Sequence, residues 1–177
     1  MHESLVDISP EALERHAPLM STFCKRTLDL VEEHDPRLQR PFRGSAFAAM
    51  TFNFGPKTLT YPHQDYQNLS WGWCSVTSLG TYDHKKGGHL ILWDLMVAVE
   101  FPPHSTVFIP SAIVEHSNTA IGSTESRMSI TQYNSAGLFR WIVFGFMTKR
   151  KAGLLGMEPL SWWLRPRHMF SRIPPPS

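Results

Sequence analysis

Cysteine and long apolar runs are scarce in this sequence, and each scarcity excludes a class of protein. Cys24 and Cys74 are its two cysteines, and they form no CxxC pair, so a zinc site is disfavoured. Two lone cysteines in a chain with a normal core indicate a reducing compartment. The most apolar late stretch, GLFRWIVFGFM, is far shorter than a membrane span and contains Arg140. The first residues also lack a signal-peptide layout, so we expect a soluble, intracellular protein with no membrane partner.

Excess charge of one sign is scarce too, because the formal net charge is only +2. So small a charge gives no strong overall field to attract nucleic acid. The cations are unevenly distributed, with a run formed by Lys149, Arg150 and Lys151, followed by Arg165, Arg167 and Arg172. A basic segment of this kind is either a solvated tail or a contact surface for an acidic partner.

The chain does contain enough apolar material for one domain, with 42% hydrophobic residues among 177. Near the N-terminus, Ser9, Pro10 and Glu11 are typical of a helix start. Apolar residues then recur at helical spacing. This predicts one helix, or two helices broken near Pro18, over about residues 10 to 33.

From residue 44 onward the pattern changes to short segments rich in β-branched and aromatic residues, separated by Gly, Pro or charged turns. These segments are residues 45–55, 58–63, 71–82, 89–95, 97–102, 106–112, 114–121 and 127–133. They predict an all-β core with flanking helices (α+β), in the form of a double-stranded β-helix, a cupin-like jelly roll of about eight strands. We expect the N-terminal helix to pack on one sheet. Residues 137–146 fit either a ninth strand or a helix.

The expected organisation is a single domain over residues 1–177. A helical segment and linker occupy residues 1–43, and the jelly-roll core occupies residues 44–147. Residues 148–177 form a basic C-terminal segment with a short amphipathic helix over residues 157–170 and a frayed end.

The stretch YPHQDYQN raises the question of a metal site, because His63 and Asp65 lie two positions apart in it. Two histidines and one carboxylate suit non-haem Fe(II) that must also bind a cosubstrate and dioxygen. The histidines that could supply the third ligand are His84, His89, His104 and His116. His116 fits best, because it lies between strand-like segments in VEHSNT, whereas His84 lies in a turn and His104 follows two prolines.

Arg127 and Ser129 complete the pattern. A dicarboxylate cosubstrate that chelates iron at one end needs a cation at the other, and a guanidinium binds a carboxylate with two parallel hydrogen bonds. Ser129 follows two residues later and therefore faces the same side of a strand, where it can donate a further bond. The alternative interpretation is a set of surface histidines with a structural salt bridge.

In combination, His63-x-Asp65, His116 and Arg127-x-Ser129 resemble the 2-oxoglutarate- and Fe(II)-dependent dioxygenases. The resemblance extends to the nucleic-acid-modifying branch that contains the ten-eleven translocation (TET) and J-binding proteins (JBP), and to its short fungal members in particular. It covers roughly residues 40 to 147. The similar phrases are FNFGPKTLTYPHQDYQNLSWGWCSVTSLGTYDHKKGGHLILWDL, VEFPPHSTVFIPSAIVEHSNT and SITQYNSAGLFRW.

The resemblance assigns roles to four further residues. His89 and Asn53 match positions that contact 2-oxoglutarate in relatives, although an edge histidine near a turn and a turn-capping asparagine are the competing interpretations. Tyr133 matches an aromatic residue that stacks on the base, and Asn68 matches a polar residue that reads the base edge. The competing interpretations are a core aromatic for Tyr133 and a turn residue for Asn68.

The resemblance also implies a reaction. It predicts an enzyme that uses Fe(II), 2-oxoglutarate and O2 to oxidise a methyl group on a base flipped out of methylated DNA. 5-Methylcytosine, converted to 5-hydroxymethylcytosine and further, is the first expectation, and demethylation of N6-methyladenine is the second. Such a role places the protein in the nucleus. The alternatives are an oxygenase for a small molecule or a protein side chain, and a non-catalytic jelly-roll binding module.

Overall fold

The computed structural model describes residues 10–157, which divide into two compact units. One unit is Ala49–Ser135, and the other comprises residues 10–48 and 136–157. Ser9 lies outside the described residues. So do the helix expected over residues 157–170, apart from its first residue, and the chain end after it. The single domain and the packing of the N-terminal helix on a sheet remain predictions.

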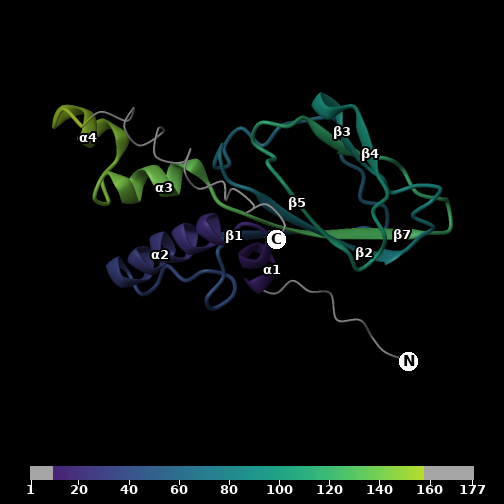
Figure 1. The fold of residues 1–177 in the computed structure, drawn as a ribbon, viewed down its shortest axis with the longest axis horizontal. Helices are drawn as coiled ribbons and strands as arrows, with labels where there is room; N and C mark the ends of the chain where they lie inside the picture. The colour runs from purple at the N-terminus through teal and green to yellow at the C-terminus, as the bar shows by residue number, and fades with distance from the viewer. Residues whose placement is uncertain (1–9, 158–177) are drawn as a thin grey trace, which may run out of the picture. The chain divides into compact units, whose positions relative to one another are not determined.

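The unit Ala49–Ser135 is built from two antiparallel sheets (Figure 1). The larger sheet has the order β1-β7-β2-β5, with β1 at Ala49–Asn53, β7 at Ser126–Tyr133, β2 at Cys74–Thr81 and β5 at Thr106–Ile109. The smaller has the order β4-β3-β6, with β4 at Val97–Val99, β3 at Leu90–Leu92 and β6 at His116–Asn118. A 3-10 turn, η1, spans Trp93–Leu95 between β3 and β4. This β-rich core with a few helices is the predicted jelly-roll fold.

The apolar core of this unit draws residues from both sheets. Cys74 of β2, Ile109 of β5 and Leu90 of β3 are buried together with Phe101, which follows β4. Cys74 and Ile109 pair directly in the β2–β5 register. Because alternate residues of a strand share one face, the same strands can present further side chains toward this interior.

Seven of the eight expected strand segments contain a strand, and the exception is residues 58–63. This segment contacts β6 through irregular bonds. The Asn118 backbone amide donates a hydrogen bond to the Thr60 carbonyl. The Thr60 backbone amide donates in turn to the side-chain oxygen of Asn118. Pro62 has no N–H to donate to a ladder. The side chain of one β6 residue thus replaces part of a regular strand pairing.

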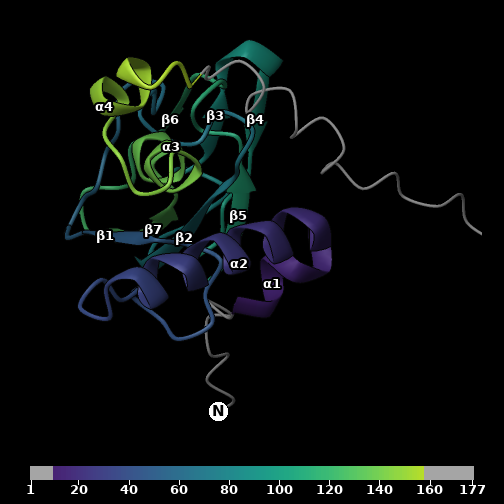
Figure 2. The same ribbon diagram turned by 90° about the vertical axis from the view of Figure 1, so that its left-hand side faces the viewer.

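The second unit is helical. Of the two alternatives expected near Pro18, one helix or two, the structure has two: α1 covers Pro10–His16, α2 covers Pro18–His34, and Ala17 lies between them (Figure 2). Residues 137–146 prove to be mainly helical, because α3 spans Ala136–Val143. Phe23 of α2 and Phe139 of α3 lie with their ring centroids 6.2 Å apart.

A last helix, α4, covers Lys149–Leu154 and carries the basic run at its start. The Thr148 side chain accepts a hydrogen bond from the Lys151 amide and caps this helix. None of the helices in residues 10–157 is long and apolar enough to cross a membrane.

Strand β7 is central to the larger sheet, because it pairs along its length with β2 and, from Ser129 to Tyr133, with β1. Gly80 of β2 pairs with Arg127 of β7 and has a φ of +112°. A Cβ atom at Gly80 would lie 2.3 Å from the Ser126 carbonyl oxygen. Glycine therefore permits the close strand approach that positions Arg127.

We expect Gly80→Ala to destabilise the protein by about 1–3 kcal/mol, because alanine would meet both a backbone clash and a strained φ. Denaturant unfolding measures the change. Gly153→Ala is the matched control, since nothing lies within 4 Å of a Cβ at this α4 position. Equal stabilities of the two variants would contradict the packing argument.

Candidate metal and carboxylate site

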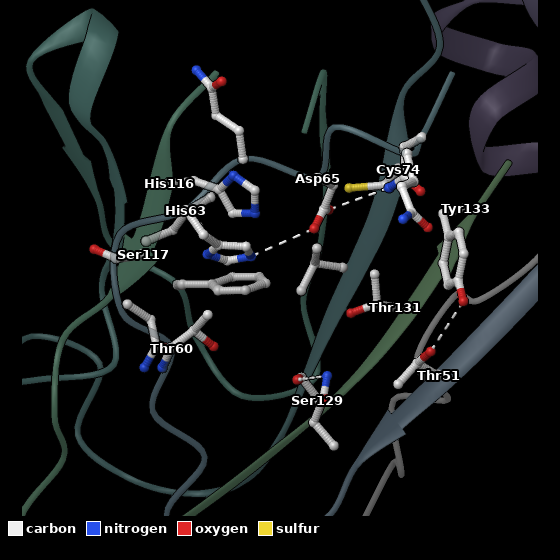
Figure 3. Close-up of a pocket in the computed structure, with 18 of the residues that line it drawn as sticks. Thr51, Thr60, His63, Asp65, Cys74, His116, Ser117, Ser129, Thr131 and Tyr133 are labelled. Carbon is white, nitrogen blue, oxygen red and sulfur yellow. Dashed lines mark hydrogen bonds and ion pairs between the residues drawn. The ribbon is translucent and has the colours of Figure 1, made fainter. Parts of the chain in front are cut away.

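Two backbone hydrogen bonds place His63 beside His116. The His63 amide donates to the His116 carbonyl at 3.1 Å, and the His116 amide donates to the His63 carbonyl at 2.9 Å. This reciprocal pair joins the segment before Asp65 to β6. As a result the two imidazole rings lie with their centroids 4.3 Å apart (Figure 3).

Both rings are oriented in the same way. His63 Nδ1 lies 2.9 Å from the Tyr61 carbonyl oxygen, and His116 Nδ1 lies 2.9 Å from the Val114 carbonyl oxygen. A carbonyl can only accept, so each Nδ1 carries the proton and donates it. Each Nε2 then has a free lone pair, which is the tautomer that a metal ligand requires.

Asp65 supplies the third donor. Its Oδ1 lies 3.5 Å from His63 Nε2, and ligand atoms of His63, Asp65 and His116 all lie within 4.8 Å of one another. Figure 3 shows the two rings and the carboxylate directed toward a common point. One ion can therefore contact all three residues. The donor set fits Fe(II) and leaves further coordination positions open.

The protonation state of His116 suits a ligand. Burial lowers the pKa of His116 below its ordinary value; the nearby His63 lowers it further, whereas the Val114 carbonyl and Asp65 oppose the shift. The ring is consequently neutral at neutral pH. A neutral ring binds a cation without first losing a proton.

The three residues line a cavity of about 590 Å³ within the β unit. Arg127 lines the same cavity and is only 3% exposed. Its Nη1 donates to the Thr58 carbonyl at 3.3 Å, but its Nε has no hydrogen-bond partner among the described residues. No carboxylate in the described part of the chain lies within ion-pair distance of Arg127.

A buried guanidinium without a counter-ion is unfavourable, because removal of one charge from water costs several kcal/mol. The arrangement at Arg127 is therefore suited to an anionic ligand. The Phe101 ring, whose centroid lies 5.8 Å from the guanidinium carbon, gives only partial compensation through its π face.

Ser129 and Asn53 stand beside Arg127 on paired strands. They are partners in the β1–β7 register, and Asn53 Nδ2 donates to Ser129 Oγ at 3.0 Å. Since the Ser129 oxygen accepts this bond, its hydroxyl hydrogen remains available for a carboxylate in the cavity. Asn53 thus orients the hydroxyl of Ser129.

Arg127, Ser129, Thr131 and Tyr133 all line the cavity, as alternate residues of a strand should. The register of β7 with β2 runs without a bulge from Ser126 to Gln132, and with β1 to Tyr133. Tyr133 is half-buried, and its hydroxyl lies 3.5 Å from Thr51 Oγ1 (Figure 3). Asn68 also lines the cavity, next to Asp65.

His89 is not among the residues that line the cavity. It immediately precedes β3, and its Nδ1 lies 3.3 Å from Thr119 Oγ1. The next residue, Leu90, is a buried cavity residue. Adjacent residues of an extended chain face opposite sides, which accounts for the absence of His89 from the cavity lining.

Two residues of the site were not anticipated from the sequence. Ser111 anchors the Asp65 loop by accepting hydrogen bonds from it, and Asn118 holds the segment before His63. Asn118 follows His116 by two positions on β6, which is a usable signal for a residue on the same strand. Ser111 lies in an ordinary Pro-Ser turn, so no sequence pattern distinguishes it.

No protein-family model matches the sequence, and no curated protein matches it. Among solved structures, it is similar to NgTET1 in complex with 5mC DNA, with a TM-score of 0.51 and 18% identity over 75% of this chain. The chain spans about half of NgTET1, since the match covers 50% of that chain. This likeness shows that the chain shares the fold of that part of NgTET1.

A second match is the collagen prolyl hydroxylase of Paramecium Bursaria Chlorella virus-1, determined as a 2OG complex. It has a TM-score of 0.35 and 10% identity, and covers 63% of this chain and 70% of that chain.

We expect Arg127→Met to weaken 2-oxoglutarate binding by about 10- to 150-fold, the equivalent of a charge-assisted hydrogen bond. The ligand-free variant should be at least as heat-stable as the wild type, because an uncompensated buried charge is removed. Calorimetry and thermal unfolding measure the two effects. Ser129→Ala is the control with a smaller loss of affinity. A destabilised Arg127→Met that still binds 2-oxoglutarate normally would show that Arg127 is structural.

Proposed function

We propose that the protein is an Fe(II)- and 2-oxoglutarate-dependent dioxygenase that oxidises a methyl group on a nucleic-acid base. One observation carries the proposal: His63, Asp65 and His116 share a cavity with the buried Arg127, which has no carboxylate partner among the described residues. A metal-binding triad alone would suit many functions. A dicarboxylate that chelates the metal at one end also requires a cation, such as Arg127, for its second carboxylate in the same cavity.

His63, Asp65 and His116 would hold the iron, while Arg127 and Ser129 would hold the far carboxylate of 2-oxoglutarate. With 2-oxoglutarate and O2, the bound iron supplies the oxidation of a methyl group to hydroxymethyl, releasing succinate and CO2. A hydroxymethyl group on nitrogen then leaves as formaldehyde, so an N-methyl substrate is demethylated.

The nucleic-acid substrate is the finer part of the proposal. It is supported by the TET-like fold and by the row of cavity residues that ends in Tyr133. 5-Methylcytosine in DNA is the first candidate and N6-methyladenine the second, and a nuclear location follows from such a substrate. Each requires a base flipped into a pocket and stacked on an aromatic ring.

An oxygenase for a small molecule or a protein side chain is the second candidate. The observation in its favour is that Ala49–Ser135 contains four Lys and Arg residues against six Asp and Glu residues, a net charge of −2. A unit of this charge attracts no polyanion on its own.

Positive charge is instead concentrated in residues 136–177, which contain seven Lys and Arg residues against one Glu, a net charge of +6. Lys149, Arg150 and Lys151 of α4 are all exposed. We assign phosphate contacts to this C-terminal segment, since cations that bind phosphates account for most non-specific affinity.

The direct test is incubation with methylated oligonucleotides, Fe(II), 2-oxoglutarate and O2, followed by mass spectrometry of the bases and assay of succinate. Hydroxymethylated or demethylated bases in step with succinate are expected from the wild type and absent with His116→Ala. Succinate release stimulated only by free metabolites or peptides would favour the second candidate. A lack of 2-oxoglutarate turnover under all conditions would favour a non-catalytic jelly-roll binding module.

We expect Tyr133→Ala to weaken binding of methylated oligonucleotides by about 5- to 150-fold, because base–aromatic stacking contributes about 1–3 kcal/mol. Tyr133→Phe keeps the ring and should be mild. Turnover of 2-oxoglutarate without substrate should be similar in both variants, which makes it the internal control. Unchanged oligonucleotide affinity in Tyr133→Ala would remove Tyr133 from the base pocket.

Neutralising Lys149, Arg150 and Lys151 to Gln should reduce the slope of log affinity against log salt by up to about 2.7 for duplex DNA, at about 0.9 per phosphate contact. The measurement is a salt titration of oligonucleotide binding. Lys85→Gln with Lys86→Gln, in the acidic unit, should leave the slope unchanged. If both sets change the slope alike, the cations of α4 are only a solvated surface.

A further inference from the structure

The loop that carries Asp65 is closed by a set of bonds that the proposed reaction does not itself require. The Asp65 amide donates to the Ser111 carbonyl at 2.9 Å, and the Asn68 amide donates to the Asp65 carbonyl at 2.8 Å. Asn68 Nδ2 lies 3.2 Å from both Asp65 Oδ2 and Ser111 Oγ. Asn68 therefore links the metal-binding carboxylate to a fixed point on the neighbouring loop.

The two oxygens of the Asp65 carboxylate consequently differ. Oδ1 faces the histidines, 3.5 Å from His63 Nε2, whereas Oδ2 accepts the bond from Asn68. A carboxylate that is free to rotate can give both oxygens to one ion. A bond to Oδ2 keeps that oxygen away from the metal and preserves a coordination position for other ligands.

Ser111 is well placed to anchor this arrangement. It is 1% exposed, and its amide donates to the Ile109 carbonyl at the end of β5. Its side chain is also hydrogen-bonded to Cys74 of β2, whose thiol pKa is raised by burial to about 12 and which is therefore neutral. Figure 3 shows Cys74 beside Asp65. The anchor thus belongs to the β2–β5 pair of the larger sheet.

We propose that Asn68, held by Ser111, is a positioning residue that confines Asp65 to one metal-binding oxygen. The proposal rests on the proposed function, because it requires a metal at His63, Asp65 and His116. It differs from the base-reading role that the resemblance assigns to Asn68. Both hydrogens of the Asn68 side-chain amide have acceptors, Asp65 and Ser111, so no N–H remains for a base.

Calorimetric titration with Co(II), without substrate or 2-oxoglutarate, tests the proposal directly. Co(II) should bind the wild type, and His116→Ala should abolish this binding. Asn68→Ala should weaken Co(II) binding by about 10- to 100-fold, the usual effect of losing a partner of a metal ligand. Ser111→Ala should produce a loss in the same direction, and Ser111→Thr, which keeps the hydroxyl, should restore near-wild-type affinity.

Two controls separate positioning from folding and from base recognition. The melting temperatures of the metal-free variants identify those that remain folded, and Ser111→Ala serves if Asn68→Ala does not fold. Oligonucleotide affinity of metal-free Asn68→Ala should equal that of the wild type. Wild-type Co(II) affinity in a folded Asn68→Ala or Ser111→Ala would overturn the proposal. So would a loss of oligonucleotide binding without a loss of Co(II) binding. A wild type that binds no Co(II) would instead refute the proposed function.

Discussion

The reciprocal backbone bonds between His63 and His116 are the interaction on which the site depends. They bring an irregular segment alongside β6 and place two ligands that lie more than fifty positions apart within reach of one ion. The other features of the metal site build on this hydrogen-bonded pair. The Tyr61 and Val114 carbonyls fix the two tautomers, and the loop after His63 returns Asp65 to the same point. A pair of backbone hydrogen bonds thus brings together two of the ligands that a metal requires.

Strand β7 provides the other end of the site by a simpler rule. Its period of two presents Arg127, Ser129 and Tyr133 on one face, and this face lines the cavity. Because Arg127 is buried, an anionic ligand would stabilise its charge. Asn53 donates to the Ser129 oxygen and so leaves the Ser129 hydroxyl hydrogen free to donate. The two ends share one cavity, so a ligand that chelates the metal can also meet the guanidinium.

Much of this could be predicted from the sequence, because it follows from local patterns. The helix break at Pro18 follows from proline chemistry, and the shared face of Arg127 and Tyr133 follows from strand alternation. The grouping of His63, Asp65 and His116 was predicted from their residue types and spacing. These features need only the period of the element and the identity of the side chains.

The rest could not be predicted, because it depends on contacts between distant segments. Residues 58–63 have strand-like composition, yet the Asn118 side chain, bonded to the Thr58 carbonyl and the Thr60 amide, replaces part of a regular ladder. A one-residue difference at the start of β3 decides which residue lines the cavity, and this residue is Leu90 and not His89. Residues 137–146 are almost wholly apolar, so they carry no period that separates helix from strand. Asn68 was assigned by its place in a motif, while its bonds to Asp65 and Ser111 appear only in three dimensions.

We propose that the metal group of His63, Asp65 and His116 and the Arg127 guanidinium are two ends of one ligand site. The measurement that tests it most directly is 2-oxoglutarate affinity, determined anaerobically by calorimetry with and without a divalent ion. If one ligand contacts both ends, the ion must raise 2-oxoglutarate affinity, and 2-oxoglutarate must raise ion affinity by the same factor. We expect this reciprocal gain, and we expect it to be lost when His116 is replaced by Ala. Equal 2-oxoglutarate affinity with and without the ion would contradict it.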